Sequence, residues 1–250
     1  MVNLLLITSG SMANAHEHSY IGGELDLFAL ATNWKRYIKK EVSSYITGDV
    51  LEVGAGIGST TGALHDGTAR RWVCLEPDKT LALRLKARLI SCRNGSSTTN
   101  VVVGSLRTFS DDPSFDCILY IDVLEHIENH RAEIEAAARL VRQSGHIVIL
   151  SPAHHWLFSE FDKSIGHLRR YNRTELRSIM PTGWVEEKLI YMDSVGILLS
   201  LGNVVGLRQL MPTRRQILIW DRVCVPASRL FDRLFHGTVG KSVLAVWRKG

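Results

Sequence analysis

Short apolar runs alternate with amphipathic segments through the middle of the chain. The clearest runs are DVLEVG at 49–54, WVCLE at 72–76 and FDCILYI at 115–121, with shorter ones at VVVG and HIVILS. Between them, residues 78–92 and 129–141 repeat apolar side chains every three or four positions, which indicates helices. Continuous apolar strands alternating with amphipathic helices predict a parallel sheet covered on both faces.

Helical and strand patterns continue on both sides of this segment. Residues 1–46 form a lead-in whose later part has helical spacing, and apolar runs at 184–192 and 241–249 predict the last two strands. Residues 193–240 lie between those strands and predict a helical insertion or lid. We therefore predict one α/β domain over residues 1–250, a doubly wound, seven-stranded, mostly parallel sheet with a C-terminal helical insertion.

Composition adds limits rather than a function. The chain has 250 residues, 45% of them hydrophobic, which is enough to fill the core of one large domain. A formal charge of +5 permits an anionic partner without requiring one. The four cysteines form no CxxC pair, which is typical of free thiols in a reducing compartment, so we expect a cytoplasmic protein. No apolar stretch is long enough to predict a membrane-spanning helix.

A glycine-rich turn at residues 51–58, LEVGAGIG, follows the first strand. A dinucleotide-binding GxGxxG motif counted from Gly54 would need glycine at Ser59, whereas this chain has its third glycine one residue earlier. Glu52 precedes the turn, and a carboxylate there suits a cationic ligand better than a pyrophosphate. Glu76, at the end of the second strand, can accept two hydrogen bonds from ribose hydroxyls; the alternative is a simple helix-start acid.

These motifs resemble class I S-adenosylmethionine-dependent methyltransferases, in particular the broad bacterial group related to the quinone-biosynthesis methyltransferases. The resemblance rests on LEVGAGIG at 51–58, LEPD at 75–78 and FDCILYIDVLEHI at 115–127. It implies a Rossmann-like fold and S-adenosylmethionine as the cofactor and methyl donor. Many relatives have an aspartate where this chain has Ser105, so the chain departs from the pattern at the adenine. The cofactor-binding positions that the resemblance implies are Glu52, Gly54, Ala55, Gly56, Gly58, Glu76, Pro77, Ser105, Leu106, Asp122, Val123 and Leu124.

The loop after the fifth strand, residues 151–176, is the first candidate for acceptor binding, because α/β proteins bind ligands at the carboxyl ends of parallel strands. His167 and Tyr171 are the candidate catalytic residues, either of which could take a proton from an acceptor hydroxyl. In the alternative interpretation, Asp162 pairs with an arginine and merely orders the loop. The HEH sequence at 16–18 has no accompanying ligand set, so we predict no metal site.

The insertion at residues 193–240 is the second candidate for acceptor binding. It has a long apolar run at its start and a later helix that carries Arg222, Arg229 and Arg233. Three interpretations stay open: a lid over a hydrophobic acceptor, a peripheral contact with the inner face of a membrane, or additional core.

The motifs together predict methyl transfer from S-adenosylmethionine, with an oxygen of a small or lipid-linked molecule as acceptor. The alternatives are a nicotinamide-dependent oxidoreductase and a non-catalytic binding module that kept the fold. We expect no nucleic-acid partner, because the chain has no NPPY-like or proline–cysteine catalytic element.

Overall fold

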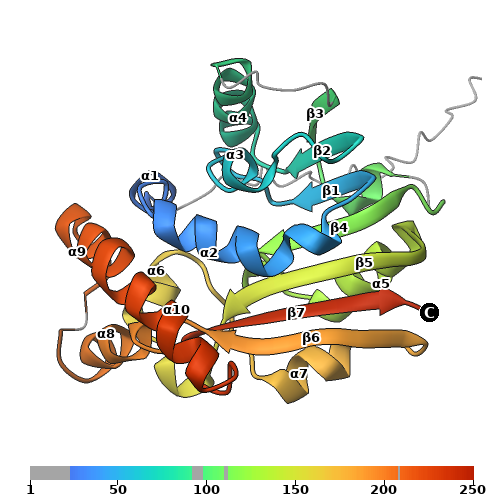
Figure 1. The fold of residues 1–250 in the computed structure, drawn as a ribbon. Coiled ribbons are helices and arrows are strands. Elements are labelled where there is room, and N and C mark those ends of the chain that lie inside the picture. The colour runs from blue at the N-terminus through green and yellow to red at the C-terminus, as the bar shows by residue number, and fades with distance from the viewer. Residues whose placement is uncertain (1–22, 92–97, 110–111, 208) are drawn as a thin grey trace, which may run out of the picture.

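The computed structural model describes residues 23–91, 98–109, 112–207 and 209–250. The HEH sequence lies outside the described residues. Within them, strands and helices alternate in the order that the sequence predicts, and the sheet runs through the centre of the molecule (Figure 1).

The sheet has seven strands in the order β3-β2-β1-β4-β5-β7-β6. Neighbouring strands from β3 to β5 pair in parallel, and β7 is antiparallel to both of its neighbours. This confirms the predicted doubly wound, mostly parallel sheet. The strands are β1 (Asp49–Val53), β2 (Arg71–Glu76), β3 (Thr98–Val103), β4 (Phe115–Ile121), β5 (Val141–Pro152), β6 (Trp184–Met192) and β7 (Ser242–Lys249).

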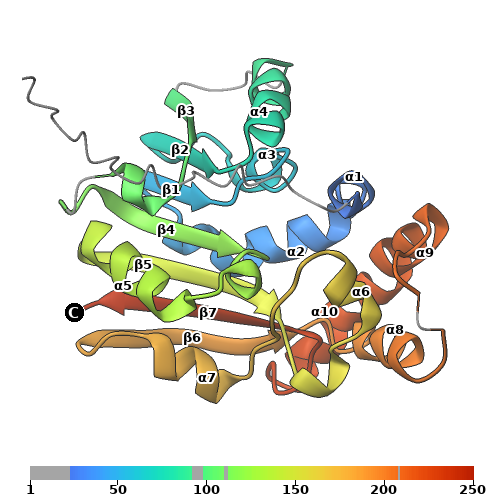
Figure 2. The same cartoon turned by 180° about the vertical axis from the view of Figure 1, so that it is seen from behind.

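Helices cover both faces of the sheet, because alternate side chains of each strand point to opposite sides. One core joins the sheet to α5 (His130–Leu140) and α7 (Arg173–Ile179). The other joins it to α2 (Thr32–Val42), α4 (Lys79–Ser91) and the last helices of the chain. Figures 1 and 2 show these two layers from opposite sides. The remaining short helices of this part are α1 (Glu24–Phe28), η1 (Ser43–Tyr45), α3 (Thr61–Leu64), η2 (Leu106–Thr108), η3 (Leu124–His126), η4 (His155–Leu157) and α6 (Glu160–Ser164).

Two local predictions from the sequence need correction. The helical pattern before residue 46 is divided into α1 and α2, because Ala31 has a ψ of 71°, outside the helical range. Helix α5 also passes directly into β5 at Val141, although the strand was expected to begin at His146. Gly145 therefore lies inside β5, where a Cβ would be 2.9 Å from the carbonyl oxygen of Asp116 on the neighbouring strand.

The insertion between β6 and β7 consists of helices that lie at one end of the sheet (Figures 1 and 2). It begins with α8 (Gly196–Gly202) and the π-helical turn η5 (Asn203–Leu207). The helices α9 (Arg214–Ile219), η6 (Trp220–Cys224) and α10 (Val225–Leu234) then follow one another without a break. We call this continuous stretch, residues 214–234, the helical rod. Among the described residues, no helix is long and apolar enough to cross a membrane.

Candidate functional site

A cavity of about 510 Å³ lies at the carboxyl ends of β1, β4 and β5. The glycine turn and the end of β4 form one part of its wall, and the loop after β5 forms another. The lead-in helices and the insertion, which are far apart in the sequence, close the rest. Its lining includes Glu52, Gly54, Ala55, Gly56, Asp122, Glu125, His126, Leu157, Phe161, His167, Phe28, Lys35, Leu199, Ile219, Trp220 and Lys241.

The glycine turn is shaped by backbone conformations that other residues rarely adopt. Gly54 has a φ of +66°, and a Cβ there would lie 2.7 Å from a methyl carbon of Val123. Gly58 has a φ of +74°, and its Cβ would lie 2.3 Å from Leu85 on α4. Gly54 therefore lets the chain turn at the cavity wall, whereas Gly58 lets α4 pack against the turn.

Glu52 lies on β1, almost completely buried, and lines the cavity. Its carboxylate accepts a hydrogen bond from the indole nitrogen of Trp72 at 2.9 Å and from the thiol of Cys74 at 3.9 Å. Burial raises the pKa of Glu52 to about 7. Both of these donors are uncharged, so they do not neutralise the carboxylate. A cation that entered the cavity could therefore pair with it.

Glu76 is buried at the end of β2 and holds the turn together. Its two carboxylate oxygens accept hydrogen bonds from the backbone nitrogens of Gly56, at 2.7 Å, and Asp78, at 2.9 Å. Each carboxylate oxygen can accept a second bond, so these contacts leave room for ribose hydroxyls. Glu76 does not itself line the 510 Å³ cavity; it lies behind the turn.

The other predicted cofactor positions divide into exposed and buried residues. Pro77 and Ser105 are exposed at the ends of β2 and β3, which leaves them accessible to an adenine ring. Leu106 and Leu124 are buried and belong to the hydrophobic core, and Val123 packs against that core. Neither Leu106 nor Leu124 lines the cavity.

Asp122 follows β4 and lines the cavity with a φ of +55°. Such a conformation is uncommon for residues other than glycine and is concentrated at functional sites. Removal of its carboxylate from water raises the pKa of Asp122 to about 6, and the positive charges of His167, Lys241 and Lys35 partly oppose this rise. Asp122 and Glu52 thus give the cavity a negative wall beside the glycine turn.

His167 and Asp162 form a hydrogen-bonded pair in the part of the cavity wall that the loop after β5 contributes. His167 Nδ1 lies 2.8 Å from Asp162 Oδ1, and Asp162 is completely buried. Arg170 donates two further hydrogen bonds to the same carboxylate, both at 2.9 Å. Asp162 therefore pairs with an arginine, as the alternative interpretation of the loop expected. The same carboxylate also orients the ring of His167.

These contacts determine the protonation of the pair. Burial alone would raise the pKa of Asp162, but the hydrogen bonds from His167 and Arg170 hold it far below its usual range. Burial alone would lower the pKa of His167, but Asp162 and the nearby charges of Glu125 and Asp122 raise it instead. Asp162 is therefore ionised at neutral pH, and His167 binds a proton more readily than a free imidazole does.

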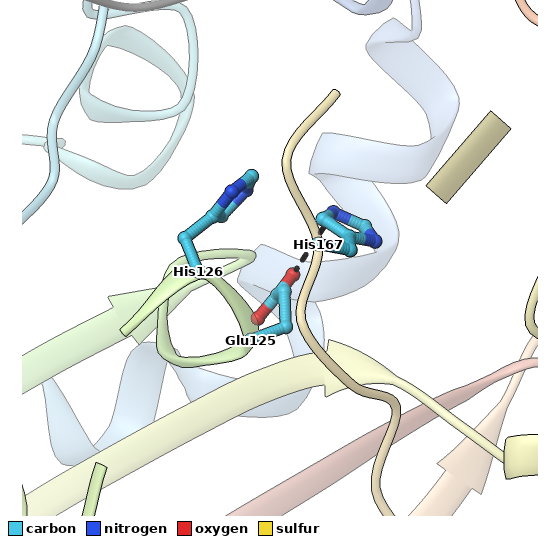
Figure 3. Close-up of side chains that lie close together, drawn as sticks. All are labelled: Glu125, His126 and His167. Atoms are coloured by element: carbon cyan, nitrogen blue, oxygen red, sulfur yellow. Dashed lines mark ion pairs between the residues drawn. The ribbon is translucent and has the colours of Figure 1, made fainter. Parts of the chain in front are cut away.

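Glu125 lies between the end of β4 and His167 (Figure 3). Its Oε2 accepts a hydrogen bond from Ser151 at 3.0 Å, while its buried Oε1 has no hydrogen-bond partner and lies 3.8 Å from His167 Nε2. Burial raises the pKa of Glu125 to about 8. Glu125 and His167 therefore interact through their charges: His167 opposes the rise in the pKa of Glu125, and Glu125 raises the pKa of His167.

His126 adds a second imidazole to this group. Its ring packs edge-on against the ring of His167, with 4.7 Å between centroids, and burial lowers its pKa to about 4. Glu125, His126 and His167 each place one ligand-type atom within 4.8 Å of the others. No sequence motif predicts this cluster, because its third member is some forty residues away along the chain.

Tyr171, the other candidate base, lies outside the cavity. It is buried, and its hydroxyl contacts His130 Nδ1 at 2.6 Å and the carbonyl oxygen of Leu124 at 3.2 Å. Burial raises the pKa of Tyr171 well above its usual value. This placement does not favour Tyr171 as a base and indicates that it anchors the loop.

Lys35, Lys241 and Trp220 line the cavity, although no sequence motif indicates them. Lys35 of α2 is buried, and burial lowers its pKa to about 8. Lys241, just before β7, lies 3.3 Å from Asp193 and 4.0 Å from the ring centroid of Trp220. Only the fold brings these residues together; in the sequence, Lys35 is one of several lysines in an amphipathic helix.

The residues at the glycine turn fit the methyl donor that the sequence predicts. S-adenosylmethionine carries an ammonium and a sulfonium group, and the carboxylates of Glu52 and Asp122, which line the cavity, could face these two groups. Burial raises the pKa values of both groups, and a bound cation would favour their ionised forms. We therefore conclude that a cationic ligand suits this part of the cavity.

Comparison with known proteins agrees with this geometry. Residues 51–149 match a family model described as a methyltransferase domain. A ubiquinone biosynthesis O-methyltransferase from Alkalilimnicola ehrlichii is 31% identical over 102 residues, which are 40% of this chain and 39% of that protein. The match therefore spans about two fifths of that relative.

Solved structures share the fold over most of the chain. A protein from Bacillus halodurans, described as a methyltransferase, has a TM-score of 0.59 at 15% identity, covering 86% of this chain and 98% of its own. The N-methyltransferase NodS from Bradyrhizobium japonicum, solved with S-adenosyl-L-homocysteine, has a TM-score of 0.55 at 15% identity and covers 88% of both chains. At these identities the likeness concerns the fold.

Proposed function

We propose that this chain, whose residues 51–149 match a methyltransferase-domain family model, uses S-adenosylmethionine to methylate an oxygen atom of an apolar, lipid-linked acceptor. The observation that carries the proposal is one cavity whose lining includes carboxylates at the glycine turn and at the end of β4 together with a histidine that a buried carboxylate orients. The first feature suits the cationic donor, and the second suits removal of an acceptor proton.

On the donor side, the residues of this chain bind and orient S-adenosylmethionine. Glu52 and Asp122 would face its ammonium and sulfonium groups. Glu76 would contact the ribose, and Ser105 would contact the adenine. When bound, the donor supplies a methyl group on a positively charged sulfur. Alignment and exclusion of water then account for much of the catalysis in such a site.

On the acceptor side, His167 is the proposed general base. The acceptor oxygen forms a bond to the methyl carbon as the carbon–sulfur bond breaks, and the hydroxyl proton passes to His167 Nε2. Asp162 fixes the ring through Nδ1 and stabilises the imidazolium that forms, as a carboxylate does in a carboxylate–histidine pair. Oxygen is favoured over nitrogen by the name of the curated relative, an O-methyltransferase.

An apolar acceptor is supported by the side chains beyond His167. The loop after β5 contributes Leu157 and Phe161, the lead-in contributes Phe28, and the insertion contributes Ile217 and Ile219. The insertion thus forms a wall of the cavity, as a lid over a hydrophobic acceptor would. A nicotinamide-dependent oxidoreductase or a non-catalytic module is not favoured by the family match.

The test is a transfer assay with the purified full chain, labelled S-adenosylmethionine and fractionated bacterial lipid extract. We expect label in an organic-phase product, in which mass spectrometry finds one added methyl on oxygen. His167→Gln should lower the turnover number by about 10²-fold while donor affinity changes little. In the wild type, turnover should rise with pH through a pKa above 6.5, because the base must be unprotonated. Label transfer to an amine, or full turnover by the His167→Gln variant, would contradict the proposal.

A further inference from the structure

The helical rod, residues 214–234, has an apolar stripe on its outer side. Ile219, Val223, Leu230 and Leu234 are exposed by 46%, 62%, 69% and 67%. Leu230 and Leu234 lie four residues apart in α10 and therefore share a face of that helix, and Ile219 and Val223 lie beside and within the π-helical turn η6 that precedes it. The opposite side of the rod is buried against the domain through Ile217, Trp220, Val225 and Ser228. The outer stripe therefore does not belong to the core.

A stripe of arginines runs beside the apolar stripe. Arg222, Arg229 and Arg233 each immediately precede one of its apolar residues, and in the α-helical part of the rod this offset is about 100° around the axis. Arg222 and Arg233 are exposed, and Arg229 is half-buried with its guanidinium over the ring of Tyr37. An apolar face bordered by basic residues is the pattern of helices that lie on membrane surfaces.

The acidic residues of the insertion are all turned inward. Asp193, Asp221 and Asp232 are at most 4% exposed, and each accepts hydrogen bonds within the domain. Asp221 binds the backbone nitrogen of Trp34 at 2.9 Å, and Asp232 binds that of Asp193 at 2.7 Å. Among the described residues of 193–240, the exposed charged side chains are therefore all arginines, which gives this surface a single sign of charge.

The cavity opens at the same part of the molecule. Leu199 of α8 and Ile219 of the rod both line the cavity, yet 47% and 46% of their surfaces are exposed. Leu198 and Val205 add two further exposed apolar side chains, at 69% and 71%. Figure 2 shows α8 and α9 next to each other at the end of the sheet. The exposed apolar side chains of α8 and of the rod therefore include residues of the cavity wall.

We propose that the outer face of the rod docks on an anionic membrane surface and that the acceptor enters the cavity from the lipid between α8 and α9. The two stripes determine the orientation: the apolar residues enter the interface and the arginines contact the anionic headgroups. The route of the acceptor rests on the proposed function. The docking itself does not, because it depends only on the surface of the free protein.

The experiment measures co-sedimentation of the full chain with vesicles of phosphatidylcholine alone or with 30% phosphatidylglycerol, without donor or acceptor. We expect binding to the anionic vesicles at low salt and release at high salt, because screening weakens surface electrostatics. Arg222→Glu with Arg233→Glu should lower the partition coefficient by at least about 25-fold, from about fivefold for each arginine. Leu230→Ser with Leu234→Ser should also lower it.

Matched controls come from α4, which has exposed residues of both kinds outside this face. Leu83→Ser with Ile90→Ser removes side chains that are 67% and 69% exposed, and Arg84→Glu with Lys86→Glu changes the charge by the same amount. Both control variants should bind as the wild type does. Equal losses in controls and rod variants, or no binding to anionic vesicles, would overturn the proposal. So would light scattering that shows a dimer dissociated by the leucine substitutions, because a second copy would then cover this face.

Discussion

The pH dependence of donor binding tests the role of Glu52 directly. Burial raises the pKa of this carboxyl to about 7, so about half of the free protein carries it protonated at pH 7 and about ten elevenths at pH 6. A cationic donor binds the ionised form. If Glu52 faces the donor's ammonium group, the apparent affinity for S-adenosylmethionine should fall about fivefold, or about 1 kcal/mol, from pH 7 to pH 6.

Isothermal titration calorimetry at these two pH values measures this change, and the donor's α-amino group, which titrates near 7.7–8.0, stays charged at both. Binding at pH 7 should also release about half a proton, which titrations in two buffers of different ionisation enthalpy detect. Glu52→Gln keeps an acceptor for Trp72 and should bind more weakly by about 1.5–3 kcal/mol, without proton release from this site.

Asp122→Asn serves as the comparison variant, because Asp122 also lines the cavity but its pKa is raised only to about 6. It should keep most of the fall in affinity between pH 7 and pH 6. A flat affinity in the wild type over this range, or the same fall in the Glu52→Gln variant, would refute the assignment of Glu52 to the donor cation.

Three further predictions concern other parts of the site. Glu76→Ala should weaken donor binding by about 1.5–3 kcal/mol in a folded protein, and unchanged affinity by calorimetry would leave Glu76 only its backbone contacts. Asp162→Asn should lower the free energy of unfolding by about 3–5 kcal/mol in urea titrations, because Arg170 would stay buried without its partner. The pKa of Asp162 is depressed in the folded state, so this difference should be present above about pH 4 and shrink as the pH falls through the folded value. Removal of metal with a chelator should leave turnover unchanged, because the proposed mechanism uses His167 as a base and not as a metal ligand; lost turnover that zinc restores would instead assign a metal to this cluster.

The proposed donor half of the site can be located from the sequence because its information is local. The turn at residues 51–58, the acid at the end of β2 and the segment after β4 each lie on a strand end that the apolar pattern already locates. In a parallel sheet the carboxyl ends of such strands meet at one edge, so sequence order and spatial order agree. Gly58 is the exception, since its contact with Leu85 on α4 depends on helix packing that no local pattern reveals.

The acceptor half could not be predicted in the same way, because it is made by long-range contacts. Lys35 comes from the lead-in, Lys241 from just before the last strand, and Trp220 from the insertion. The two candidate bases, four residues apart in the same loop, have different surroundings: His167 faces the cavity, whereas Tyr171 is held by His130 and a backbone carbonyl. The spacing of these two residues alone could not distinguish them.

The buried acids of the insertion connect the acceptor site with the proposed docking face. Asp193 accepts hydrogen bonds from Trp220 at 2.7 Å and Ser228 at 2.6 Å, and it pairs with Lys241 at the cavity wall. The rod is therefore held in a fixed rotation about its axis by contacts on its inner side. In that rotation the apolar stripe and the arginine stripe point outward, and Trp220 lines the cavity. Because the same helix forms the wall of the cavity and its outer surface, we expect a lipid surface that binds the rod to lie next to the cavity opening at Leu199 and Ile219.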